Sequence, residues 1–190
     1  MTPTVLRGTH RAVAPSIVFR ALTEADLPLL HSWLVRPHVT EWWEEAPTFE
    51  EVCADYLPRL APQSVGALDA PAGVVQYLAC EDGVPFGYAQ AYRVMAHQAD
   101  GWWPDETDPF ALGVDQLIGL EERLGQGLGT RMLRAFVDFL LLDARVTTIQ
   151  TDPEPTNARA IAAYRKAGFS ANGLVTTLDG PAMLMRVTRV

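Results

Sequence analysis

The segment Leu124-Gly-Gln-Gly-Leu-Gly-Thr130 has the composition of a loop that binds an anion. Glycines let successive backbone N–H groups converge on a phosphate, and a helix that begins after such a loop points the positive end of its dipole there. The chemistry predicted is recognition of a pyrophosphate. The segment lacks the GKS/T of a P-loop and the spacing and ribose-binding acid of a Rossmann loop. Taken alone, it is equally compatible with a plain connection between a strand and a helix.

Aspartates beside predicted strands are the second group of residues that could do chemistry. Asp115 stands one residue inside an apolar stretch, where a carboxylate is costly unless it meets water or a partner. Asp152 precedes Pro153 at a strand end, where its side chain could bond to the backbone instead. Asp100 and Asp179 each precede a glycine, and Asp-Gly is a common turn dipeptide. Position alone therefore singles out Asp115.

Aromatic side chains form the third group. Tyr164 lies three residues after Ile161 on the same face of a predicted helix, so it is either a core aromatic or a phenol aimed at a site. The pairs Trp42–Trp43 and Trp102–Trp103 would ordinarily be core residues, and at least one member of each pair is expected to be buried.

Charge is distributed unevenly along the 190-residue chain. The net charge of −8 opposes nucleic acid and anionic membranes as partners, and Lys166 is the only lysine. Residues 41–115 contain 14 acidic residues and two arginines, a net charge of −12, whereas the flanking segments are each net +2. We expect Asp105, Glu106 and Asp108 to form a solvent-exposed acidic loop that attracts cations weakly.

Cysteine usage and apolar runs place the chain in a broad class. Cys53 and Cys80 are far apart and lack metal-ligand spacing, so we expect free structural thiols and no metal site. The N-terminus has no apolar stretch of signal-peptide length, and the strongest apolar run, 139–142, is too short to span a bilayer. These features favour a cytoplasmic protein, either a monomer or a homodimer.

The elements that must position these residues alternate between strands and helices. Strands are predicted at residues 16–20, 74–80, 86–94, 114–119 and 146–151, with a final hairpin at 174–187 turned at Asp179-Gly180. Helices are predicted after the capping signals at 23–26 and 48–51, and at 128–140 and 157–167. The fold class is α+β, with a mixed, mostly antiparallel sheet flanked by helices. Residues 1–15 are expected to be a flexible segment and 16–190 a single domain.

Two motifs in a fixed order carry a resemblance. Gly127-Leu-Gly129, followed about thirty residues later by Asn157-x-x-Ala160-x-x-x-Tyr164-x-x-x-Gly168-Phe169, resembles the GNAT superfamily of N-acetyltransferases. The resemblance implies a GNAT fold, whose central strands splay apart at the acetyl-coenzyme A site. That family has Gln or Arg three residues before the first of these glycines, and Leu124 occupies the place here. Backbone amides are therefore expected to hold the pyrophosphate.

The same resemblance implies that acetyl-coenzyme A is the donor substrate. Its pyrophosphate is expected on the amides of Gln126–Thr130. Its pantetheine is expected to pair with the backbone around Leu117–Gly119, as an added strand would. Asn157 is expected to hydrogen-bond the arm, and Tyr164 to assist the leaving thiolate. The residues assigned to the donor are Leu117, Ile118, Gly119, Gly125, Gln126, Gly127, Leu128, Gly129, Thr130 and Asn157.

A closer resemblance rests on clusters of tryptophan and aspartate. Spanning roughly residues 17–188, the chain is similar to the aminoglycoside 6'-N-acetyltransferases. The segments that carry this are Glu41-Trp-Trp43, Tyr56-Leu-Pro58, Gly87-Tyr-Ala-Gln90, Asp100-Gly-Trp-Trp103, Glu106-Thr-Asp-Pro109, Gly113-Val-Asp-Gln-Leu117, Gln150-Thr-Asp-Pro153 and Thr177-Leu-Asp-Gly-Pro181. Residues 61–73 lie outside this match.

The closer resemblance implies a pocket for a polycation, in which carboxylates meet ammonium groups and aromatic faces cover sugar rings. Its expected members are Asp100, Asp115, Asp152, Asp179, Trp43, Trp102, Trp103, Tyr56 and Tyr92. The implied reaction is direct transfer from acetyl-coenzyme A to the 6'-amine of the antibiotic, which inactivates it, with neither a metal nor an acyl-enzyme. Asp115 would deprotonate the amine or position it, and a positioned base typically contributes about 10² to 10⁴ in rate.

Two alternatives stand beside this hypothesis. A GNAT enzyme of the same fold could acetylate a lysine-derived or siderophore-type metabolite, although four acidic pocket positions favour a polycation. A non-catalytic drug-binding module is the other alternative. The presence of Gly127, Gly129, Asn157 and Tyr164 argues against it, because sequestration alone needs no cradle for a donor.

Overall fold

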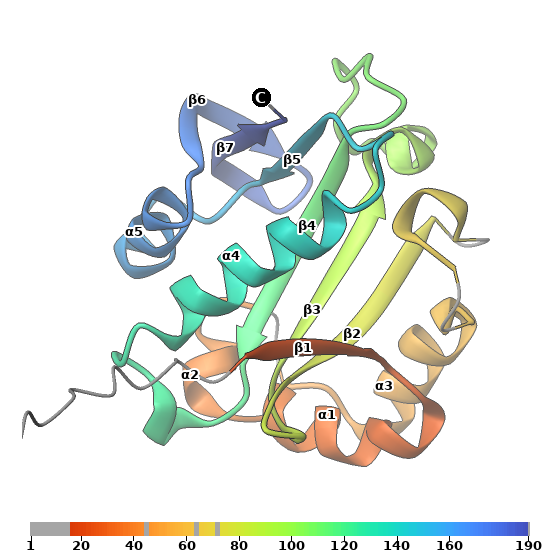
Figure 1. Ribbon diagram of the computed structural model, residues 1–190, viewed down its shortest axis with the longest axis vertical. Coiled ribbons are helices and arrows are strands. Elements are labelled where there is room, and N and C mark those ends of the chain that lie inside the picture. Colours follow the sequence, from red (N-terminus) through yellow and green to blue (C-terminus); the bar gives the residue numbers. More distant parts are fainter. Residues whose placement is uncertain (1–15, 44–45, 63–64, 71–72, 190) are drawn as a thin grey trace, which may run out of the picture.

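The computed structural model describes residues 16–43, 46–62, 65–70 and 73–189. Within these ranges the strands form a seven-stranded sheet in the order β1-β2-β3-β4-β5-β7-β6 (Figure 1). They are β1 Ile17–Ala21, β2 Val74–Glu81, β3 Val84–Arg93, β4 Leu112–Ile118, β5 Thr148–Thr151, β6 Ser170–Thr177 and β7 Gly180–Thr188. The predicted α+β class is confirmed. The segment 1–15, expected to be flexible, lies outside the described residues.

The sheet is antiparallel except where β4 meets β5. These two strands run parallel, and their register contains only the pairs Leu112↔Ile149 and Gly113↔Gln150. Beyond Gly113, β4 continues along β3 through the pair Gly87↔Ile118 without further pairing to β5. The edge of β4 that faces β5 is therefore open from Val114 onward (Figure 1). This is the splay that the resemblance implies.

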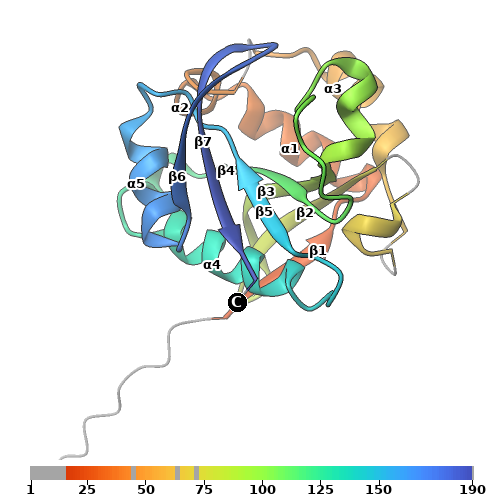
Figure 2. The same cartoon turned by 90° about the horizontal axis from the view of Figure 1, so that it is seen from above.

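Helices cover both faces of the sheet. They are α1 Leu27–Leu34, α2 Pro37–Thr40, α3 Phe49–Tyr56, α4 Leu128–Leu140 and α5 Ala158–Lys166. Figure 2 shows α4 and α5 on one side of the sheet and α1 to α3 on the other. The capping box predicted at Thr48 is present, because its hydroxyl accepts from the N–H of Glu51 while that carboxylate accepts from the N–H of Thr48.

Each face has its own apolar core. The α4/α5 face includes Leu112, Val114 and all six apolar residues predicted for α4, each of which is buried. The opposite core joins α1 to α3 with alternate residues of the strands, among them Leu78, Tyr88 and Leu117. Because successive strand residues point to opposite faces, Asp115 on β4 shares the α1–α3 face with Leu117.

Several boundaries differ from the prediction. Thr23 caps a 3₁₀ turn, 24–26, and α1 begins only at Leu27. The short helix α2 was not predicted, because four residues that begin with a proline carry no helical periodicity. A 3₁₀ turn at 94–100 follows β3 directly, and β6 begins at Ser170 rather than at residue 174. Gly119 follows the last residue of β4 and Asn157 caps α5, so these two predicted site residues lie just outside the observed strand and helix.

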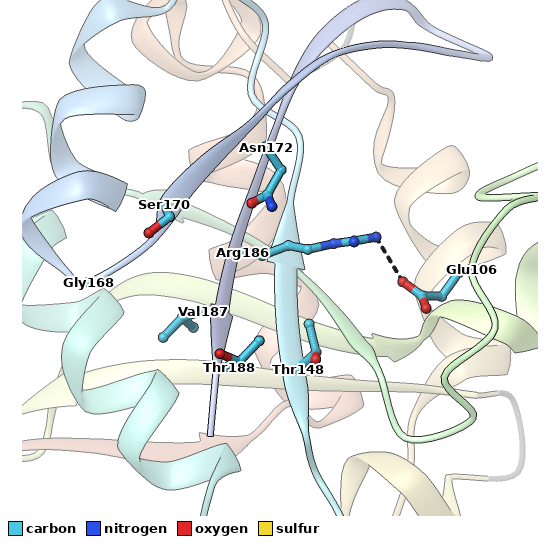
Figure 3. A pocket seen from close by; sticks show the side chains of 8 residues that line it. All are labelled: Glu106, Thr148, Gly168, Ser170, Asn172, Arg186, Val187 and Thr188. Carbon is cyan, nitrogen blue, oxygen red and sulfur yellow. Dashed lines mark hydrogen bonds and ion pairs between the residues drawn. The ribbon is translucent and has the colours of Figure 1, made fainter. Parts of the chain in front are cut away.

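The expectation of a solvated acidic loop holds for Asp105, which is exposed, and is wrong for two of its neighbours. The Glu106 side chain is 11% exposed and pairs with the Arg186 guanidinium on β7 at 2.8 Å. Figure 3 shows this pair spanning a polar groove. The Asp108 carboxylate bonds to the Thr147 hydroxyl and to the N–H of Phe110. The loop is therefore tied to the C-terminal half of the sheet.

Across the ranges that the structure describes, no helix combines the length and apolar character needed to cross a lipid bilayer.

Candidate active site

The open edge of β4 presents backbone groups with a fixed alternation. The Gly119 N–H bonds to the Phe86 carbonyl oxygen at 2.9 Å, so odd-numbered residues of this segment direct their N–H and C=O groups toward β3. The same groups of Val114, Gln116 and Ile118 face the gap beside β5. Of the three residues assigned to the pantetheine, Ile118 therefore presents backbone groups to the gap, whereas Leu117 and Gly119 do not.

The end of this strand is held by the segment between α1 and α2. Arg36 Nη1 donates to the Gly119 carbonyl oxygen at 2.8 Å, and His38 Nε2 lies 2.9 Å from the Ile118 carbonyl oxygen. A Cβ atom on Gly119 would lie 2.1 Å from the Trp33 indole, so glycine is required for the packing of α1. Sequence reasoning missed Arg36 and His38, because no local pattern signals contacts about 80 residues away.

The glycine-rich loop is open and has the backbone geometry expected of an anion cradle. Gly125 and Gly127 both have φ of +74°, a conformation that L side chains rarely adopt. A Cβ atom on either would meet nothing within 4 Å, so the approach to the backbone is unobstructed. Helix α4 begins at Leu128, and the N–H groups of Leu128, Gly129 and Thr130 have no partner within the helix. The Gln126 side chain turns back to the Glu122 carbonyl oxygen.

Asn157 and Tyr164 lie on the helix that follows β5. Asn157 Oδ1 accepts from the Ala160 N–H at 2.9 Å and caps α5, which leaves its Nδ2 group for another partner. Tyr164 is 6% exposed, packs edge-on against Phe169, and its hydroxyl bonds to the Thr151 side chain. Burial raises the pKa of Tyr164 well above its ordinary value, so the phenol stays protonated. Its hydroxyl lies at the point where β5 parts from β4.

Asp115 projects from the open half of β4 and is held by one hydrogen bond. Gln90 Nε2 donates to its Oδ2 at 2.8 Å, and no other described side chain donates to it. Burial raises the pKa of Asp115 above its ordinary value. Gln90 lowers that pKa, and the negative charge of Asp179 raises it further. A raised pKa makes this carboxylate a stronger base than an exposed aspartate.

Asp152 and Asp179 converge on Asp115 from two other elements. Burial raises the pKa of Asp152 to about 7, and the charges of Asp115 and Asp179 contribute to this rise. Asp152 follows β5 directly, and Asp179 lies in the turn between β6 and β7. Residues up to 64 positions apart in sequence therefore interact electrostatically at one place in the fold.

Tyr92 and Trp103 lie beside the carboxylates. The pKa of Tyr92 is raised well above its ordinary value by burial and by the charges of Asp115 and Asp152, and its hydroxyl lies next to the Trp103 indole. A Cβ atom on Gly113 would lie 2.1 Å from the Tyr92 ring, so this ring needs a glycine on the neighbouring strand. Trp103 has φ of +51°, which is uncommon for a bulky residue.

Asp100 is the most peripheral of the predicted carboxylates. Its side chain is 69% exposed and lies 3.6 Å from His97 Nδ1. The adjacent Gly101 approaches Leu178, because a Cβ atom there would lie 3.5 Å from the Leu178 side chain. The Asp100 loop therefore borders the turn that carries Asp179, and Asp100 lies at the rim of the site.

Trp43 and Tyr56 form an aromatic wall on the α1–α3 face. Both pack edge-on against Tyr88, with ring centroids 6.2 and 5.8 Å away. They line a cavity of about 180 Å³ that reaches Gln90, the partner of Asp115. Its lining residues are Leu34, Trp43, Pro47, Glu51, Val52, Asp55, Tyr56, Arg59 and Gln90.

A larger groove of about 480 Å³ lies over β5, β7 and β6 (Figure 3). Glu106 and Arg186 cross it, and hydroxyl groups of Thr148, Ser170 and Thr188 line it. None of the predicted site residues lines this groove. The candidate residues lie instead at the smaller cavity and beside the open edge of β4. Within the described ranges, no group of three or more His, Cys, Asp or Glu side chains is placed to hold a metal ion.

Comparison with known proteins agrees with this geometry. The Acetyltransferase (GNAT) domain model matches residues 23–177. The chain is thus an acetyltransferase of the GNAT family.

More specifically, it belongs to the family of the aminoglycoside N(6')-acetyltransferases. It is 49% identical to aminoglycoside N(6')-acetyltransferase type 1 of Klebsiella pneumoniae over 92% of this chain and 84% of that protein. Solved structures of AAC(6')-Ib, one with paromomycin and acetyl-coenzyme A and one with coenzyme A and kanamycin, superpose with TM-scores of 0.83 at 47% identity. Each match covers 92% of this chain, with 94% and 95% of the respective solved chains.

Proposed function

We propose that this enzyme transfers the acetyl group of acetyl-coenzyme A to the 6'-amine of aminoglycoside antibiotics and so inactivates them. The observation that carries the proposal is the convergence of Asp115, Asp152 and Asp179 beside the open edge of β4. Three carboxylates in one partly buried site suit a ligand with several ammonium groups. The relatives named above carry the corresponding activity in their names or hold both kinds of ligand.

The donor half of the site fits acetyl-coenzyme A. The unobstructed loop around Gly125 and Gly127 and the free N–H groups at the start of α4 supply a cradle for its pyrophosphate. The backbone groups of Gln116 and the N–H of Ile118 offer hydrogen bonds to the pantetheine arm along the open edge. Asn157 Nδ2 remains available for the same arm.

Asp115 acts on the acceptor. An aminoglycoside amine binds as an ammonium ion and must lose a proton before its nitrogen can attack the thioester carbonyl carbon. Asp115 positions this group and accepts the proton, directly or through water. Burial raises the pKa of Asp152, and the charge of Asp115 adds to this rise, so a second negative charge is unfavourable while the site is empty.

The transfer forms one C–N bond and breaks one C–S bond. The Gln116 N–H, which points into the gap, stabilises the negative charge that develops on the carbonyl oxygen. Tyr164 stabilises the leaving sulfur by a hydrogen bond. Because burial raises the pKa of Tyr164 above that of a thiol, about 8.5, complete proton transfer to the thiolate would be uphill. Solvent supplies the final proton.

The substrates also define the partners and the place of action. We propose an aminoglycoside and acetyl-coenzyme A as the partners, neither nucleic acid nor membrane, and the cytoplasm as the compartment, since the donor is a cytoplasmic metabolite.

The test compares two aminoglycosides that differ only in a 6'-amine or a 6'-hydroxyl group. Release of the coenzyme A thiol is followed for each with the whole enzyme. The proposal predicts turnover with the amine and at least a hundredfold slower turnover with the hydroxyl, because a hydroxyl is the weaker nucleophile and cannot occupy an ammonium site. Equal thiol release from the two would contradict transfer to the 6'-position.

A further inference from the structure

A row of polar side chains crosses three central strands and ends at Asp115. The register pairs Gln76 on β2 with Gln90 on β3, and Gln90 with Asp115 on β4. Directly paired residues point to the same face of a sheet. Gln76 is 3% exposed, so the row begins in the interior of the α1–α3 face and ends at the open edge. Buried polar residues require hydrogen-bond partners, and this row therefore calls for an explanation.

Two hydrogen bonds define the orientation of the central amide. The Tyr88 hydroxyl donates to Gln90 Oε1 at 2.8 Å, and Gln90 Nε2 donates to Asp115 Oδ2 at 2.8 Å. The opposite amide orientation would place Gln90 Oε1 against the carboxylate, where two acceptors repel. The carboxylate thus selects the orientation in which Gln90 offers an N–H, and the Tyr88 hydroxyl, which can donate or accept, donates to the remaining Oε1 and holds the amide there.

The tyrosine that holds this orientation is itself immobilised. Tyr88 is fully buried, and its ring lies edge-on to the rings of Trp43 and Tyr56 at 6.2 and 5.8 Å. Trp43, Tyr56 and Gln90 line the same cavity of about 180 Å³. A sugar ring of the acceptor bound in that cavity would contact Trp43 and Tyr56. These two side chains pack against Tyr88, the hydrogen-bond partner of Gln90.

We propose that Gln90, held by Tyr88, is a positioning residue that directs the Asp115 carboxylate toward the acceptor amine. This inference rests on the role proposed for Asp115 in the transfer reaction. Gln90 occupies Oδ2 and thereby leaves Oδ1 for the amine. Gln90 acts through Asp115 and takes no proton itself.

The groups around Asp115 explain why a neutral donor is needed there. Asp152 and Asp179 present negative charges, and Tyr92 and Tyr164 are phenols whose pKa values are raised. No cation forms an ion pair with Asp115 among the described residues. Gln90 is therefore the group that stabilises its charged form before the acceptor binds, and the hydrogen bond lowers the pKa of Asp115 relative to burial alone.

The experiment measures the pH profile of kcat/KM for the aminoglycoside in Gln90→Leu and Tyr88→Phe, with Tyr77→Phe as the matched control. Tyr77 is a buried tyrosine of the neighbouring strand whose ring packs on the opposite face, against Phe136 and Phe139. Loss of the donor favours the protonated carboxylate. The acid limb of the profile is therefore expected to move to higher pH by about one unit in Gln90→Leu. Tyr88→Phe is expected to move it in the same direction by less, and Tyr77→Phe not at all.

A double variant separates positioning from an independent role. At neutral pH, Gln90→Leu is expected to lower kcat about tenfold, a part of the contribution of a positioned base, and to leave the Kd for coenzyme A unchanged. Asp115→Asn/Gln90→Leu is expected to be no slower than Asp115→Asn alone, because residues that act through one another are not additive. Losses that multiply in the double variant would overturn the inference.

Two further outcomes are distinguishable. If Asp115→Asn removes the acid limb but Gln90→Leu and Tyr88→Phe leave it in place, the positioning role of Gln90 is wrong and the role of Asp115 stands. If Asp115→Asn keeps both turnover and acid limb, the proposed mechanism fails and this inference fails with it. Tyr88→Phe keeps the test decisive should Gln90→Leu fold poorly, since it retains the ring and deletes one hydroxyl.

Discussion

At the scale of single residues, the charged forms of the site's carboxylates are destabilised until a cationic ligand binds. Asp115 and Asp152 are partly buried, Asp179 lies exposed beside them, and none of the three forms an ion pair within the described part of the chain. Burial raises the pKa values of Asp115 and Asp152, and repulsion from the neighbouring carboxylates adds to the rise. An ammonium group at this place would relieve the repulsion, so part of the binding free energy of the acceptor comes from the empty site being unfavourable.

The raised pKa of Asp152 predicts how stability changes with pH. Its pKa is about 4 in an unfolded chain and about 7 in the folded protein, so the folded state binds more protons between these values. Ionisation of Asp152 therefore destabilises the fold as pH rises from about 4 through 7. Asp152→Asn should raise Tm by a few degrees at pH 8, with a difference that shrinks toward pH 4. Differential scanning calorimetry of both proteins across this range checks it.

Two observations bear on that prediction. Addition of a polycationic aminoglycoside at pH 8 should raise the Tm of the unmodified protein more than that of Asp152→Asn. A variant that is less stable than the parent at pH 8 would show that Asp152 does not carry an unfavourable charge.

Asp115→Asn tests the chemistry at the same scale. The amide cannot accept a proton from the amine, and we expect turnover at neutral pH to fall at least tenfold, within the range for loss of a positioned base. Titration calorimetry with coenzyme A should give nearly the parent affinity, because the loop at Gly125–Gly129 is on another element. Unchanged turnover would remove Asp115 from the mechanism.

At the scale of elements, one parallel junction creates the donor site. The short pairing of β4 with β5 leaves alternate backbone groups from Val114 onward free, and the glycine loop after β4 leads directly into α4. The open edge of β4 and the first turn of α4 are therefore joined by one short loop. Both depend on backbone conformation more than on side chains, which explains how the chain tolerates Leu124 in place of Gln or Arg.

The glycine loop can be tested by a strain-matched pair of variants. Gly127 has φ of +74° and Gly83, in the β2–β3 turn, has φ of +79°, and neither would meet an atom within 4 Å of an added Cβ. Gly127→Ala and Gly83→Ala should therefore cost similar stability, about 1 kcal/mol. Only Gly127→Ala should weaken coenzyme A binding in titration calorimetry, because it distorts the cradle. Equal loss of affinity in both variants would contradict the placement of the pyrophosphate.

Much of this architecture could be predicted from local patterns. The periodicity of α4 identified all six of its buried residues, and the Asp-Gly pairs at 82–83 and 179–180 marked two hairpin turns. Such signals depend on neighbours within a few residues. Asp115 could be singled out for a related reason, because a carboxylate inside an apolar stretch is recognisable from the sequence alone.

The remainder depends on contacts between distant segments. The bond from His38 to the Ile118 carbonyl, the pair Glu106–Arg186 and the bond from Gln90 to Asp115 join residues 80, 80 and 25 positions apart. No periodicity or motif encodes such a partner. The alternation that turns the backbone of Gln116, rather than Leu117, toward the gap likewise follows from the pairing of β4 with β3, which only the structure reveals.

At the scale of the molecule, the acidity of residues 41–115 divides into two groups. Glu81, Glu106 and Asp69 are paired with arginines from the C-terminal half of the chain. These pairs connect the acidic segment to arginines later in the chain, and the opposite charges within each pair neutralise one another. The carboxylates left without an ion pair include those of the acceptor site. The carboxylates around Asp115 therefore contribute to the negative field that an approaching cation meets.

This distribution predicts a salt dependence that differs between the two substrates. Raising ionic strength from about 0.01 to about 0.15 M shortens the screening length from about 30 to about 8 Å. The value of kcat/KM for the polycationic acceptor should fall several-fold over this range, whereas kcat/KM for the anionic donor should change little or rise. Steady-state assays with each substrate varied in turn provide the comparison. A matching decrease for both substrates would argue against electrostatic attraction of the acceptor.

The central claim is that the carboxylates beside the open edge of β4 deliver one particular amine to the thioester. The most direct measurement is to convert an aminoglycoside with several amines to completion and to locate the acetyl group on the product by two-dimensional NMR. The account predicts a single product acetylated at the 6'-nitrogen. Acetylation at another nitrogen, or a mixture of singly acetylated products, would contradict it.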